Sequence, residues 1–595
     1  MTTKGKVISV VSNLVTIEVD GPISQNEICY IALDDIKIQG EVIKIDGSRA
    51  FAQVFESTRG LKIGAEADFT EHMLEVEVGP GLLSKKYDGL QGDLEAMTGV
   101  FLKRGEKTQA FSYETKWDFE PLAEPGDRVQ AGDWLGQVKE NWINHKIMVP
   151  FLLEGMWTVE SVKPKGKYTT KDFIAVLKSA QDQTYQVQMS QKVPVKVPVK
   201  AYANKPVAFK PLETGVRLID TLNPIVEGGT GFIPGPFGCG KTVLQHIIAA
   251  NAQVDLVILC ACGERANEVV EIFKEYPELD DPRTGRKLIE RTIIICNTSN
   301  MPVAAREASV YTAMTIAEYY RQMGLKVLLL ADSTSRWAQA LREMSNRMEE
   351  LPGPDAFPMD LSAVIANFYS RAGLVELNNG EKGSITFIGT VSPAGGNLKE
   401  PVTESTKKVA RCFYALAQKR ADGRRYPAID TIESYSKYLE YKEVQEYMQK
   451  NLEPHWVEKV FFVRDILLRG KEAYDSINIL GDDSVPTDYH EAYWKSELVD
   501  FGFLQQDAFD PVDKVTSMQR QRYMMDIIHN ICKADFDFDN FADVAPYFKK
   551  LINFIKQMNY SEFQKDDFKK FEDELQSTLM ERRITDDRSQ KSEVR

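Results

Sequence analysis

The stretch Gly235-Pro-Phe-Gly-Cys-Gly-Lys-Thr242 decides the fold of the central part of this chain. It matches the pattern G-x-x-x-x-G-K-[ST] in full. The apolar run 231–234 before it predicts a strand, and the run 242–250 after it predicts a helix. In this context, backbone N–H groups at the start of a helix surround phosphates, and the lysine adds a fixed positive charge. The sequence therefore predicts a P-loop that binds a nucleoside triphosphate.

The residues expected to contact the nucleotide cover the whole loop and the first turn of the helix. The Lys241 ammonium is expected beside the phosphates, and the Thr242 hydroxyl is expected to bind Mg²⁺ directly. Cys239 is either a small side chain at a variable loop position or a thiol that responds to oxidation. The full predicted nucleotide-binding set in the loop is Gly235, Pro236, Phe237, Gly238, Cys239, Gly240, Lys241, Thr242 and Val243.

The region around the loop has the pattern of a parallel α/β sheet. Buried-type strands at 254–261, 292–296 and 326–331 alternate with helical patterns of ten or more residues. Alternation at this spacing predicts a parallel sheet with helices on both faces. We therefore expect an α/β P-loop NTPase core with a RecA-like sheet.

A carboxylate ends one of these strands. Val327-Leu-Leu-Leu-Ala-Asp332 is an apolar strand closed by Asp332, which is the Walker B arrangement. Asp332 is predicted to hold Mg²⁺ through a water molecule while Thr242 binds it directly. The alternative is that Asp332 caps the following helix, which Ser333 and its neighbours would also allow.

A carboxylate and a guanidinium stand next to each other at the end of the strand that follows the P-loop helix, in Cys262-Gly-Glu-Arg265. Ligands of α/β sheets sit at the carboxyl ends of the strands, so Glu264 and Arg265 should face the γ-phosphate. A carboxylate there can orient the attacking water, and a guanidinium can bind phosphate. The structural alternative is a surface ion pair at a strand end.

The flanking regions differ in character from the central one. Short β-branched runs fill the N-terminus, a β-rich segment with Gly punctuation follows, and the end of the chain is helical and polar with a charged tail at 586–595. The predicted domains are a β-barrel at 1–75, a connecting segment at 76–109, a β-rich insertion at 110–190, the nucleotide-binding domain at 191–435 and a C-terminal helical domain at 436–595.

Composition limits the class of protein. The chain has 595 residues, with 73 basic and 87 acidic side chains and a net charge of −14. This acidic balance argues against a broad nucleic-acid footprint, and we expect no nucleic-acid partner. No run reaches the ~18 apolar residues that would span a bilayer. Seven thinly spread cysteines fit a reducing compartment, so a cytoplasmic location is predicted.

Taken together, the motifs resemble the catalytic A subunits (alpha chains) of V-type and A-type rotary ATPases. The resemblance covers nearly the whole chain, and the β-rich stretch at 110–190 is similar in placement to the insertion of that family. The segments that carry it are Gly79-Pro-Gly-Leu-Leu83, Tyr87-Asp-Gly-Leu-Gln91, Thr214-Gly-Val-Arg-Leu-Ile-Asp-Thr221, the P-loop, Cys262-Gly-Glu-Arg-Ala-Asn-Glu268, Ala331-Asp-Ser-Thr-Ser-Arg-Trp-Ala338, Val391-Ser-Pro-Ala-Gly-Gly-Asn397, Glu400-Pro-Val-Thr403 and Phe503-Leu-Gln-Gln-Asp-Ala-Phe509.

The resemblance implies a function and its partners. It implies Mg²⁺-dependent ATP hydrolysis and synthesis coupled to H⁺ or Na⁺ movement through a separate membrane sector. It implies an A3B3 ring that alternates this chain with a B-type subunit, central and peripheral stalks, and a place on the cytoplasmic face of the membrane.

The resemblance also assigns roles to individual residues. Lys241 would stabilise the phosphates, Glu264 would act as general base and Arg265 would assist at the γ-phosphate, with an arginine finger supplied in trans by the partner. Phe509 and Tyr426 would line the adenine pocket. The alternative for both aromatic residues is an ordinary place in the core.

Other classes share the P-loop core. A Rho-like nucleic-acid translocase should carry a basic, aromatic barrel at its N-terminus, whereas residues 1–75 have no excess of basic side chains and hold few aromatic ones. A secretion-type ATPase lacks the insertion at 110–190. A non-catalytic ring subunit would not be expected to keep Gly-Lys-Thr together with Glu264 and Asp332.

Overall fold

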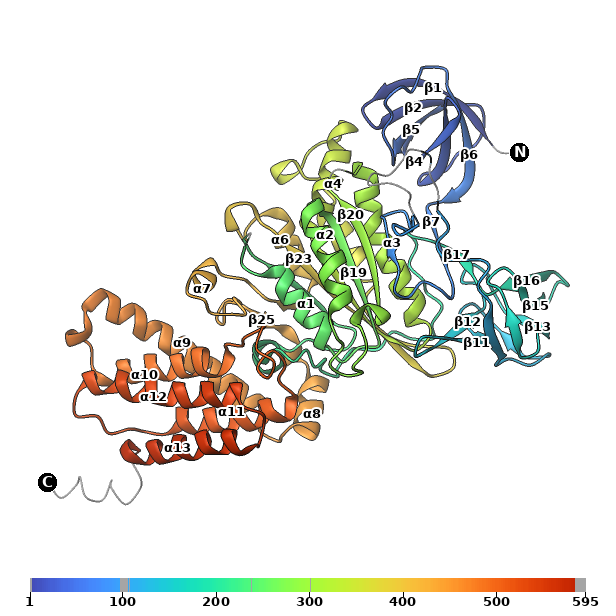
Figure 1. The fold of residues 1–595 in the computed structure, drawn as a ribbon. Helices are drawn as coiled ribbons and strands as arrows, with labels where there is room; N and C mark the ends of the chain where they lie inside the picture. The colour runs from blue at the N-terminus through green and yellow to red at the C-terminus, as the bar shows by residue number, and fades with distance from the viewer. Residues whose placement is uncertain (1–2, 97–104, 106–107, 237, 300, 584–595) are drawn as a thin grey trace.

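The structure is a computed structural model that describes residues 3–96, 105, 108–236, 238–299 and 301–583. A β-barrel lies at one end of the molecule, an α/β body lies in the middle, and a bundle of helices lies at the other end (Figure 1). A second β-rich module stands beside the α/β body, on the side of the barrel. The predicted site residue Phe237 and the charged tail at 586–595 fall outside the described residues.

The N-terminal strands close into a barrel in the order β1-β2-β5-β4-β3-β6. Successive side chains of a strand point to opposite faces, so Val15 and Ile17 fill the interior while Glu18 faces solvent. Closure removes the free edges that an open sheet of this size would leave. The strands are β1 (Lys4–Val11), β2 (Leu14–Val19), β3 (Glu27–Leu33), β4 (Ile36–Asp46), β5 (Arg49–Val54) and β6 (Glu66–Met73).

The β-rich insertion consists of two small sheets, in the orders β10-β13-β15-β16 and β12-β11-β9-β14. Their apolar side chains form a core of their own, which includes Phe119, Leu135 and Leu177. The strands are β9 (Trp117–Pro121), β10 (Arg128–Val129), β11 (Trp134–Glu140), β12 (Ile143–Met148), β13 (Trp157–Val162), β14 (Gly166–Tyr168), β15 (Phe173–Ser179) and β16 (Thr184–Gln188).

A buried polar cluster holds this module against helix α3 (Val303–Arg321). Glu140 accepts a hydrogen bond from the backbone N–H of Gly81 at 2.7 Å, and its other oxygen lies 2.6 Å from His145 Nδ1. The second ring nitrogen of His145 lies 2.8 Å from the Tyr319 hydroxyl. Because buried polar groups are costly without partners, this chain of contacts fixes the module on the α/β body.

Two short strands tie the connecting segments to the body. β7 (Glu75–Val78) pairs antiparallel with β17 (Gln191–Pro194), and the two form a sheet of their own. β8 (Lys86–Tyr87) joins the edge of the parallel sheet beside Ile294 and Ile295, which the sequence did not predict. A strand of two residues has no periodicity to detect.

The central sheet has the order β25-β24-β18-β23-β21-β19-β20-β8, with β22 antiparallel to β23. Neighbouring strands from β24 to β8 are parallel, and β25 runs antiparallel at the other edge. The further strands are β18 (Thr230–Pro234), β19 (Leu256–Glu264), β20 (Thr292–Thr298), β21 (Lys326–Asp332), β22 (Gly373–Glu376), β23 (Lys382–Val391), β24 (Cys412–Phe413) and β25 (Tyr435–Ser436).

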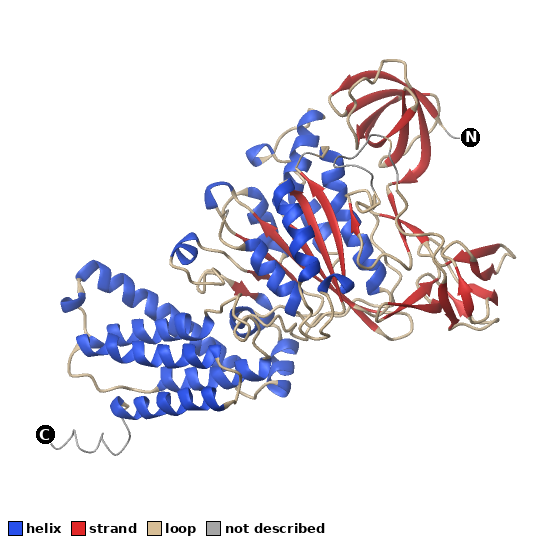
Figure 2. Ribbon diagram, viewed as in Figure 1, coloured by secondary structure: helices blue, strands red, loops and turns tan. Residues whose placement is uncertain are grey.

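Helices cover both faces of this sheet, and the strand side chains alternate between them (Figure 2). Leu328 and Leu330 of β21 belong to the same apolar cluster as Ile248 of α1, whereas Val327 and Leu329 belong to the cluster that contains α3. The helices of this region are α1 (Lys241–Asn251), α2 (Ala266–Glu275), α3, α4 (Thr334–Arg347), α5 (Leu361–Tyr369), α6 (Pro401–Val409) and α7 (Gln418–Asp422).

The C-terminal helices share their core with the α1 face of the sheet. Trp456 and Val460 of α9 and Ile528 of α11 belong to the same continuous apolar cluster as Ile248. The helices are α8 (Lys442–Asn451), α9 (Trp456–Leu480), α10 (Thr487–Glu497), the π-helix η8 (Leu498–Leu504), α11 (Met518–Lys533), α12 (Phe541–Tyr560) and α13 (Asp566–Arg582).

The predicted fold class is confirmed. The barrel, the parallel α/β core, the β-rich insertion and the helical C-terminal part all occur in the predicted order. In the part of the chain that the structure describes, no helix is both long enough and apolar enough to cross a bilayer.

Candidate nucleotide site

The P-loop connects β18 to α1, as the motif predicts, and its glycines are required for two physical reasons. Gly238 and Gly240 have φ angles of 82° and 84°, where a side chain would be strained. Gly235 has no such backbone, but a Cβ there would come within 2.6 Å of Leu416 Cβ. The loop can therefore turn sharply into α1 and keep its backbone close to a ligand.

Lys241 is the first residue of α1, and its side chain folds back over the loop. Its Nζ donates to the carbonyl oxygens of Gly235 and Pro236, both at 2.9 Å. Burial lowers the pKa of Lys241, although the Asp332 carboxylate opposes this shift. Two carbonyl oxygens of the loop thus hold the ammonium in place. Phosphate oxygens can replace them as hydrogen-bond acceptors.

Asp332 ends β21 and accepts hydrogen bonds from two threonines. Its Oδ2 accepts from Thr242 Oγ1 at 3.0 Å, and its Oδ1 accepts from Thr390 Oγ1 at 2.6 Å. The N-cap residue of α4 is Ser333. The carboxylate therefore points toward the P-loop, and the structure favours the Walker B arrangement over the helix-cap alternative.

The oxygens of Thr242 and Asp332 fit a magnesium ion. Mg²⁺ prefers hard oxygen ligands and keeps several waters or phosphate oxygens in its shell. Among the described residues, no group of three or more His, Cys, Asp or Glu side chains could hold a metal ion. Water molecules or the oxygens of a bound nucleotide would complete a shell built on this hydroxyl and this carboxylate.

Glu264 ends β19 and lies at the same edge of the sheet. The pairing of β19 with β20 shifts register between Cys262 and Glu264, and Gly263 has a φ of 74°. Such an irregularity changes the direction of the side chain that follows it, here that of Glu264. Burial raises the pKa of Glu264, and a hydrogen bond to Glu268 and the Asp332 charge raise it further.

Arg265 follows directly and occupies the N-cap position of α2, with an extended backbone. Its side chain is exposed, in contrast to the half-buried Glu264. A second guanidinium, that of Arg336 on α4, opposes the rise in the pKa of Glu264. The site therefore has two arginines near Glu264. Arg265 is exposed and follows it in the sequence, and the charge of Arg336 lowers the pKa of Glu264.

The two aromatic residues predicted for the base pocket lie on neighbouring segments. Tyr426 is 42% exposed and Phe509 is 88% exposed, so the core alternative is wrong for both. The backbone N–H of Gln506 donates to the Tyr426 carbonyl at 2.8 Å. One hydrogen bond thus joins the Tyr426 turn to the segment that carries Phe509.

A side-chain contact ties the P-loop to this aromatic region. Cys239 is buried, and its thiol donates to Gln418 Oε1 of α7 at 3.1 Å. Tyr426 in turn donates from its hydroxyl to the Ala421 carbonyl of α7 at 3.4 Å. A buried, hydrogen-bonded thiol favours the small-side-chain interpretation of Cys239 over that of an oxidisable site. Val243 is 44% exposed on the first turn of α1.

The geometry can be compared with known proteins. A V-type ATP synthase alpha chain of Borrelia recurrentis (strain A1) is 49% identical over 587 residues, which cover 98% of this chain and 100% of that protein. The chain belongs to the V-type ATP synthase alpha chain family. The alpha chain of Borrelia turicatae (strain 91E135) is 48% identical over 98% of this chain and 100% of its own length. The alpha chain of Borreliella burgdorferi (strain ATCC 35210) is 48% identical over 97% of this chain and 98% of its own length.

Family models match successive parts of the chain. The ATP synthase alpha/beta family beta-barrel domain matches residues 7–71, and the alpha/beta subunit barrel-sandwich domain matches 108–196. The nucleotide-binding domain of the family matches 215–436, and the C-terminal domain of V and A type ATP synthase matches 445–535. These matches confirm the family that the motifs resembled, and they do not favour the Rho-like or secretion-type alternatives.

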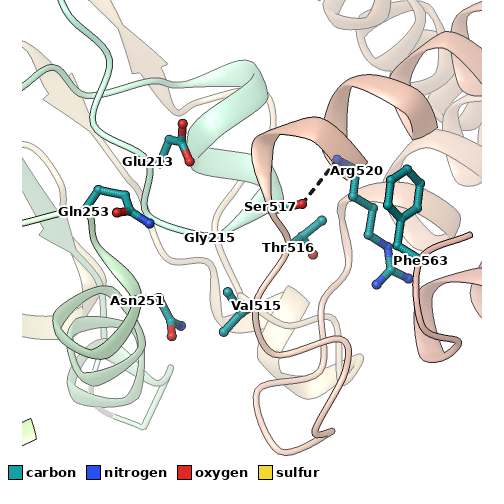
Figure 3. Close-up of a pocket in the computed structure, with 9 residues that line it drawn as sticks. All are labelled: Glu213, Gly215, Asn251, Gln253, Val515, Thr516, Ser517, Arg520 and Phe563. Atoms are coloured by element: carbon teal, nitrogen blue, oxygen red, sulfur yellow. Dashed lines mark hydrogen bonds between the residues drawn. The ribbon is translucent and has the colours of Figure 1, made fainter. Parts of the chain in front are cut away.

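A cavity of about 280 Å³ lies at the far end of α1, away from the P-loop (Figure 3). The residues that line it come from the segment before the P-loop, the end of α1 and the residues after it, the start of α11 with the residues before it, and the loop between α12 and α13. None of the site residues predicted for this family member is among them. They are Glu213, Gly215, Asn251, Gln253, Val515, Thr516, Ser517, Arg520 and Phe563.

Sequence reasoning missed three polar groups of the site. Thr390 donates to Asp332, Arg336 acts on Glu264, and Gln418 accepts from Cys239. Thr390 directly precedes the segment 391–397, at the end of an apolar run. That run predicts a strand that ends near the nucleotide, so Thr390 could have been found from the sequence. Nothing in the local pattern around Gln418 indicates its contact, because it lies 179 positions from Cys239.

Proposed function

We propose that this chain is the catalytic subunit of a V/A-type rotary ATPase, which hydrolyses and synthesises ATP and couples this reaction to transmembrane H⁺ or Na⁺ movement. The observation that carries the proposal is the convergence of three groups at one edge of the parallel sheet. These are Lys241 on the P-loop, Asp332 in contact with Thr242, and the half-buried Glu264. Phosphoryl transfer needs a cation at the phosphates, oxygens for a metal, and a carboxylate for water.

The nucleotide phosphates would lie against the loop backbone and the N-terminus of α1. There the free N–H groups of the first turn and the helix dipole favour negative charge. Lys241 would exchange its contacts with Gly235 and Pro236 for the β- and γ-phosphates. Thr242 would bind Mg²⁺ directly and Asp332 would hold it through water. When bound, the ion neutralises charge on the phosphate oxygens.

Glu264 would accept a proton from the attacking water or orient it. Its place at the carboxyl end of β19, beside the edge of the sheet that carries Asp332, favours this role. The exposed Arg265 would assist at the γ-phosphate. The arginine finger would come from the partner subunit, which places the site at an interface. Tyr426 and Phe509 would contact the adenine ring.

The partners follow from the same proposal. A B-type subunit would alternate with this chain in an A3B3 ring. Central-stalk and peripheral-stalk subunits would connect the ring to a membrane sector in other chains. The complex would place this chain at the cytoplasmic face of the membrane.

The test is Mg²⁺-ATP hydrolysis by the purified chain alone and together with its co-purified partner subunits. We expect activity only in the presence of the partner, because the site needs an arginine in trans. Lys241→Ala should reduce that activity by about a hundredfold or more, as loss of a charge-stabilising donor does. Full activity of the chain alone, or stimulation by RNA or DNA, would refute the proposal. The control is Lys450→Ala on the exposed face of α8.

A further inference from the structure

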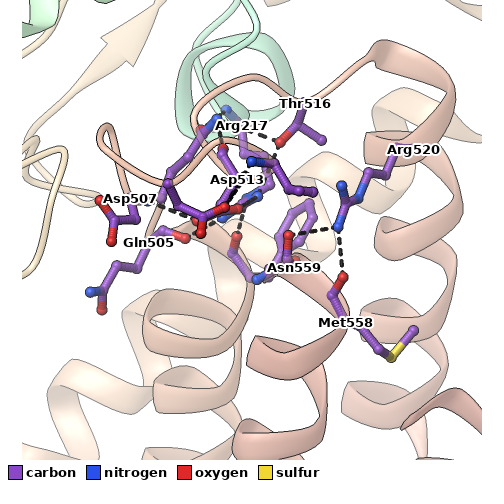
Figure 4. A network of polar contacts seen from close by, with 12 residues as sticks. Arg217, Gln505, Asp507, Asp513, Thr516, Arg520, Met558 and Asn559 are labelled. Carbon is purple, nitrogen blue, oxygen red and sulfur yellow. Dashed lines mark hydrogen bonds and ion pairs between the residues drawn. The ribbon is translucent and has the colours of Figure 1, made fainter. Parts of the chain in front are cut away.

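A single buried arginine binds the start of the loop that carries Phe509 (Figure 4). This 505–517 loop runs from the end of η8 to the start of α11. Arg217 precedes the π-helix η1 (Leu218–Leu222) and is fully buried. Its Nε donates to the Phe503 carbonyl at 2.6 Å, and its Nη2 donates to the Gln505 carbonyl. Arg217 thereby fixes the point at which the loop leaves the helix.

The same guanidinium binds the other end of the loop. Its Nη1 donates to Asp513 Oδ1 at 2.5 Å and to Thr516 Oγ1 at 3.0 Å. A planar guanidinium presents several donors in a rigid arrangement, which suits one residue to hold two strands of chain at a set spacing. Arg217 and its partners lie 286 to 299 positions apart in the sequence.

A chain of hydrogen bonds continues from Arg217 to Phe509. Asp513 accepts from Arg217 with one oxygen and from the backbone N–H of Asp507 with the other, at 2.7 Å. Asp507 Oδ1 then accepts from the backbone N–H of Phe509 at 2.9 Å. The Phe509 ring is 88% exposed, so little packing holds it. Its position is therefore set through the backbone.

The position of Tyr426 also depends on Arg217. The backbone N–H of Arg217 donates to Gln506 Oε1 at 2.9 Å, and Gln506 Nε2 donates to the Gly215 carbonyl at 2.8 Å. The backbone N–H of Gln506 donates to the Tyr426 carbonyl. The turn with Tyr426 and the loop with Phe509 thus converge on Arg217 through Gln506.

We infer that Arg217 is a positioning residue that sets the affinity of the site for the nucleotide base by holding Phe509 and Tyr426 in place. This inference rests on the proposed function, because it assumes that the two aromatic residues contact adenine. Arg217 would touch neither the base nor the phosphates. It acts on KM for ATP and not on the chemical step at the P-loop.

A purely structural role is the competing explanation, because Arg217 also joins the nucleotide-binding part to the C-terminal helices. Arg520 provides a matched control at the same junction. It is buried as well, and its Nη2 donates to the carbonyls of Met558 and Asn559 at the end of α12, at 2.6 and 2.8 Å. Its side chain thus holds the helices together without binding the 505–513 part of the loop.

The experiment compares Arg217→Lys with Arg520→Lys in the assembled complex. KM and kcat for ATP are measured together with inhibition by inorganic tripolyphosphate, a probe that has phosphates but no base. Arg217→Lys should raise KM for ATP by about tenfold, the order expected when a base loses an aromatic contact. Its kcat and its inhibition by tripolyphosphate should match the wild type. Arg520→Lys should keep the wild-type KM. Equal KM values in the wild type and Arg217→Lys would overturn the inference.

A second variant keeps the test decisive if Arg217→Lys does not fold. Asp507→Ala removes the last hydrogen bond before Phe509 and leaves Arg217 with all its partners. It should raise KM for ATP by about fivefold, the order of one lost hydrogen bond, with tripolyphosphate inhibition unchanged. A wild-type KM for Asp507→Ala overturns the inference. Failure of the wild-type complex to hydrolyse ATP would instead refute the proposed function.

Discussion

Thr242 and Asp332 lie 90 positions apart, and the hydroxyl of the first donates to the carboxylate of the second at 3.0 Å. A hydroxyl has one donor hydrogen and two acceptor lone pairs. Thr242 can therefore keep its hydrogen bond to Asp332 and still offer a lone pair to a cation. The contact orients the hydroxyl before any ligand arrives, so neither side chain has to rearrange to form the proposed metal site.

Replacing Asp332 by Asn should weaken the proposed metal site. The amide keeps the shape of the side chain, but it loses the charge that holds a hydrated divalent cation. We expect ATP hydrolysis to fall by about a hundredfold or more, and the Mg²⁺ concentration for half-maximal activity to rise. The measurement is a Mg²⁺ titration of the assembled complex. Asp118→Asn, at an exposed position of β9, is the control. An unchanged Mg²⁺ requirement would contradict the assignment.

Glu264→Gln should separate binding from hydrolysis. The amide cannot accept the proton of the attacking water, so turnover should fall by about 10²- to 10⁴-fold. Nucleotide affinity should stay close to that of the wild type, because Lys241 and the loop backbone are intact. Both quantities can be measured on the same preparation, by equilibrium binding and by phosphate release. A mutant that hydrolyses ATP at the wild-type rate rules out the base role, and Glu443→Gln on the exposed side of α8 serves as the control.

His145→Ala should destabilise the attachment of the β-rich insertion. The substitution leaves Glu140 and the Tyr319 hydroxyl buried without their shared partner. The free energy of unfolding should fall by about 2–4 kcal/mol, from the lost contacts and the cavity. Urea unfolding monitored by tryptophan fluorescence would report it. His72 is exposed on β6, so His72→Ala should have an effect within about 0.5 kcal/mol. Equal stability of the two variants would argue against this role.

The contribution of Asp500 to the free energy of unfolding should depend on pH only in acidic solution. Burial pushes its pKa upward, but the charges and hydrogen bonds of Arg420 and Arg425 outweigh this and hold the pKa below its usual value. A lowered pKa in the folded state means that the stabilisation is complete above the unfolded value of about 3.9. It is lost as the pH falls through the lower folded value.

Urea unfolding of the wild type and Asp500→Asn would measure this contribution. The variant leaves the half-buried Arg420 without its carboxylate, whereas Arg425 keeps Glu497, and it should be less stable by about 1.5–3 kcal/mol near neutral pH. The difference should stay constant from about pH 7 to pH 5 and shrink only below about pH 4. A difference that changes between pH 7 and pH 5 would mean that Asp500 titrates at a higher pH than its contacts imply.

The parts of the fold that could be predicted are those with a local signal. The strand before the P-loop and the helix after it, at 230–234 and 241–251, follow from hydrophobic runs and a glycine pattern within one window. The parallel sheet follows from repeated alternation of strands and helices. Asp332 and Glu264 were found because both end apolar strands, and the ends of parallel strands meet at one edge.

The contacts that could not be predicted join residues far apart in the chain. Thr390 reaches Asp332 across 58 positions, and Arg217 reaches Thr516 across 299. Neither residue type indicates its partner, because threonine and arginine hydrogen-bond in many settings. The edge strand at Lys86–Tyr87 is likewise set by tertiary pairing alone.

The shared core of α1 and the C-terminal helices has a mechanical consequence. α1 is a rod about 16 Å long whose first residue is Lys241, and its buried side chains belong to the same continuous apolar cluster as those of α9 and α11. Close-packed interiors resist compression, so a push on the phosphate end of the rod is not absorbed along the way. We therefore expect a shift of the phosphate end of α1 to be passed through this shared core to the helices at the far end of the molecule.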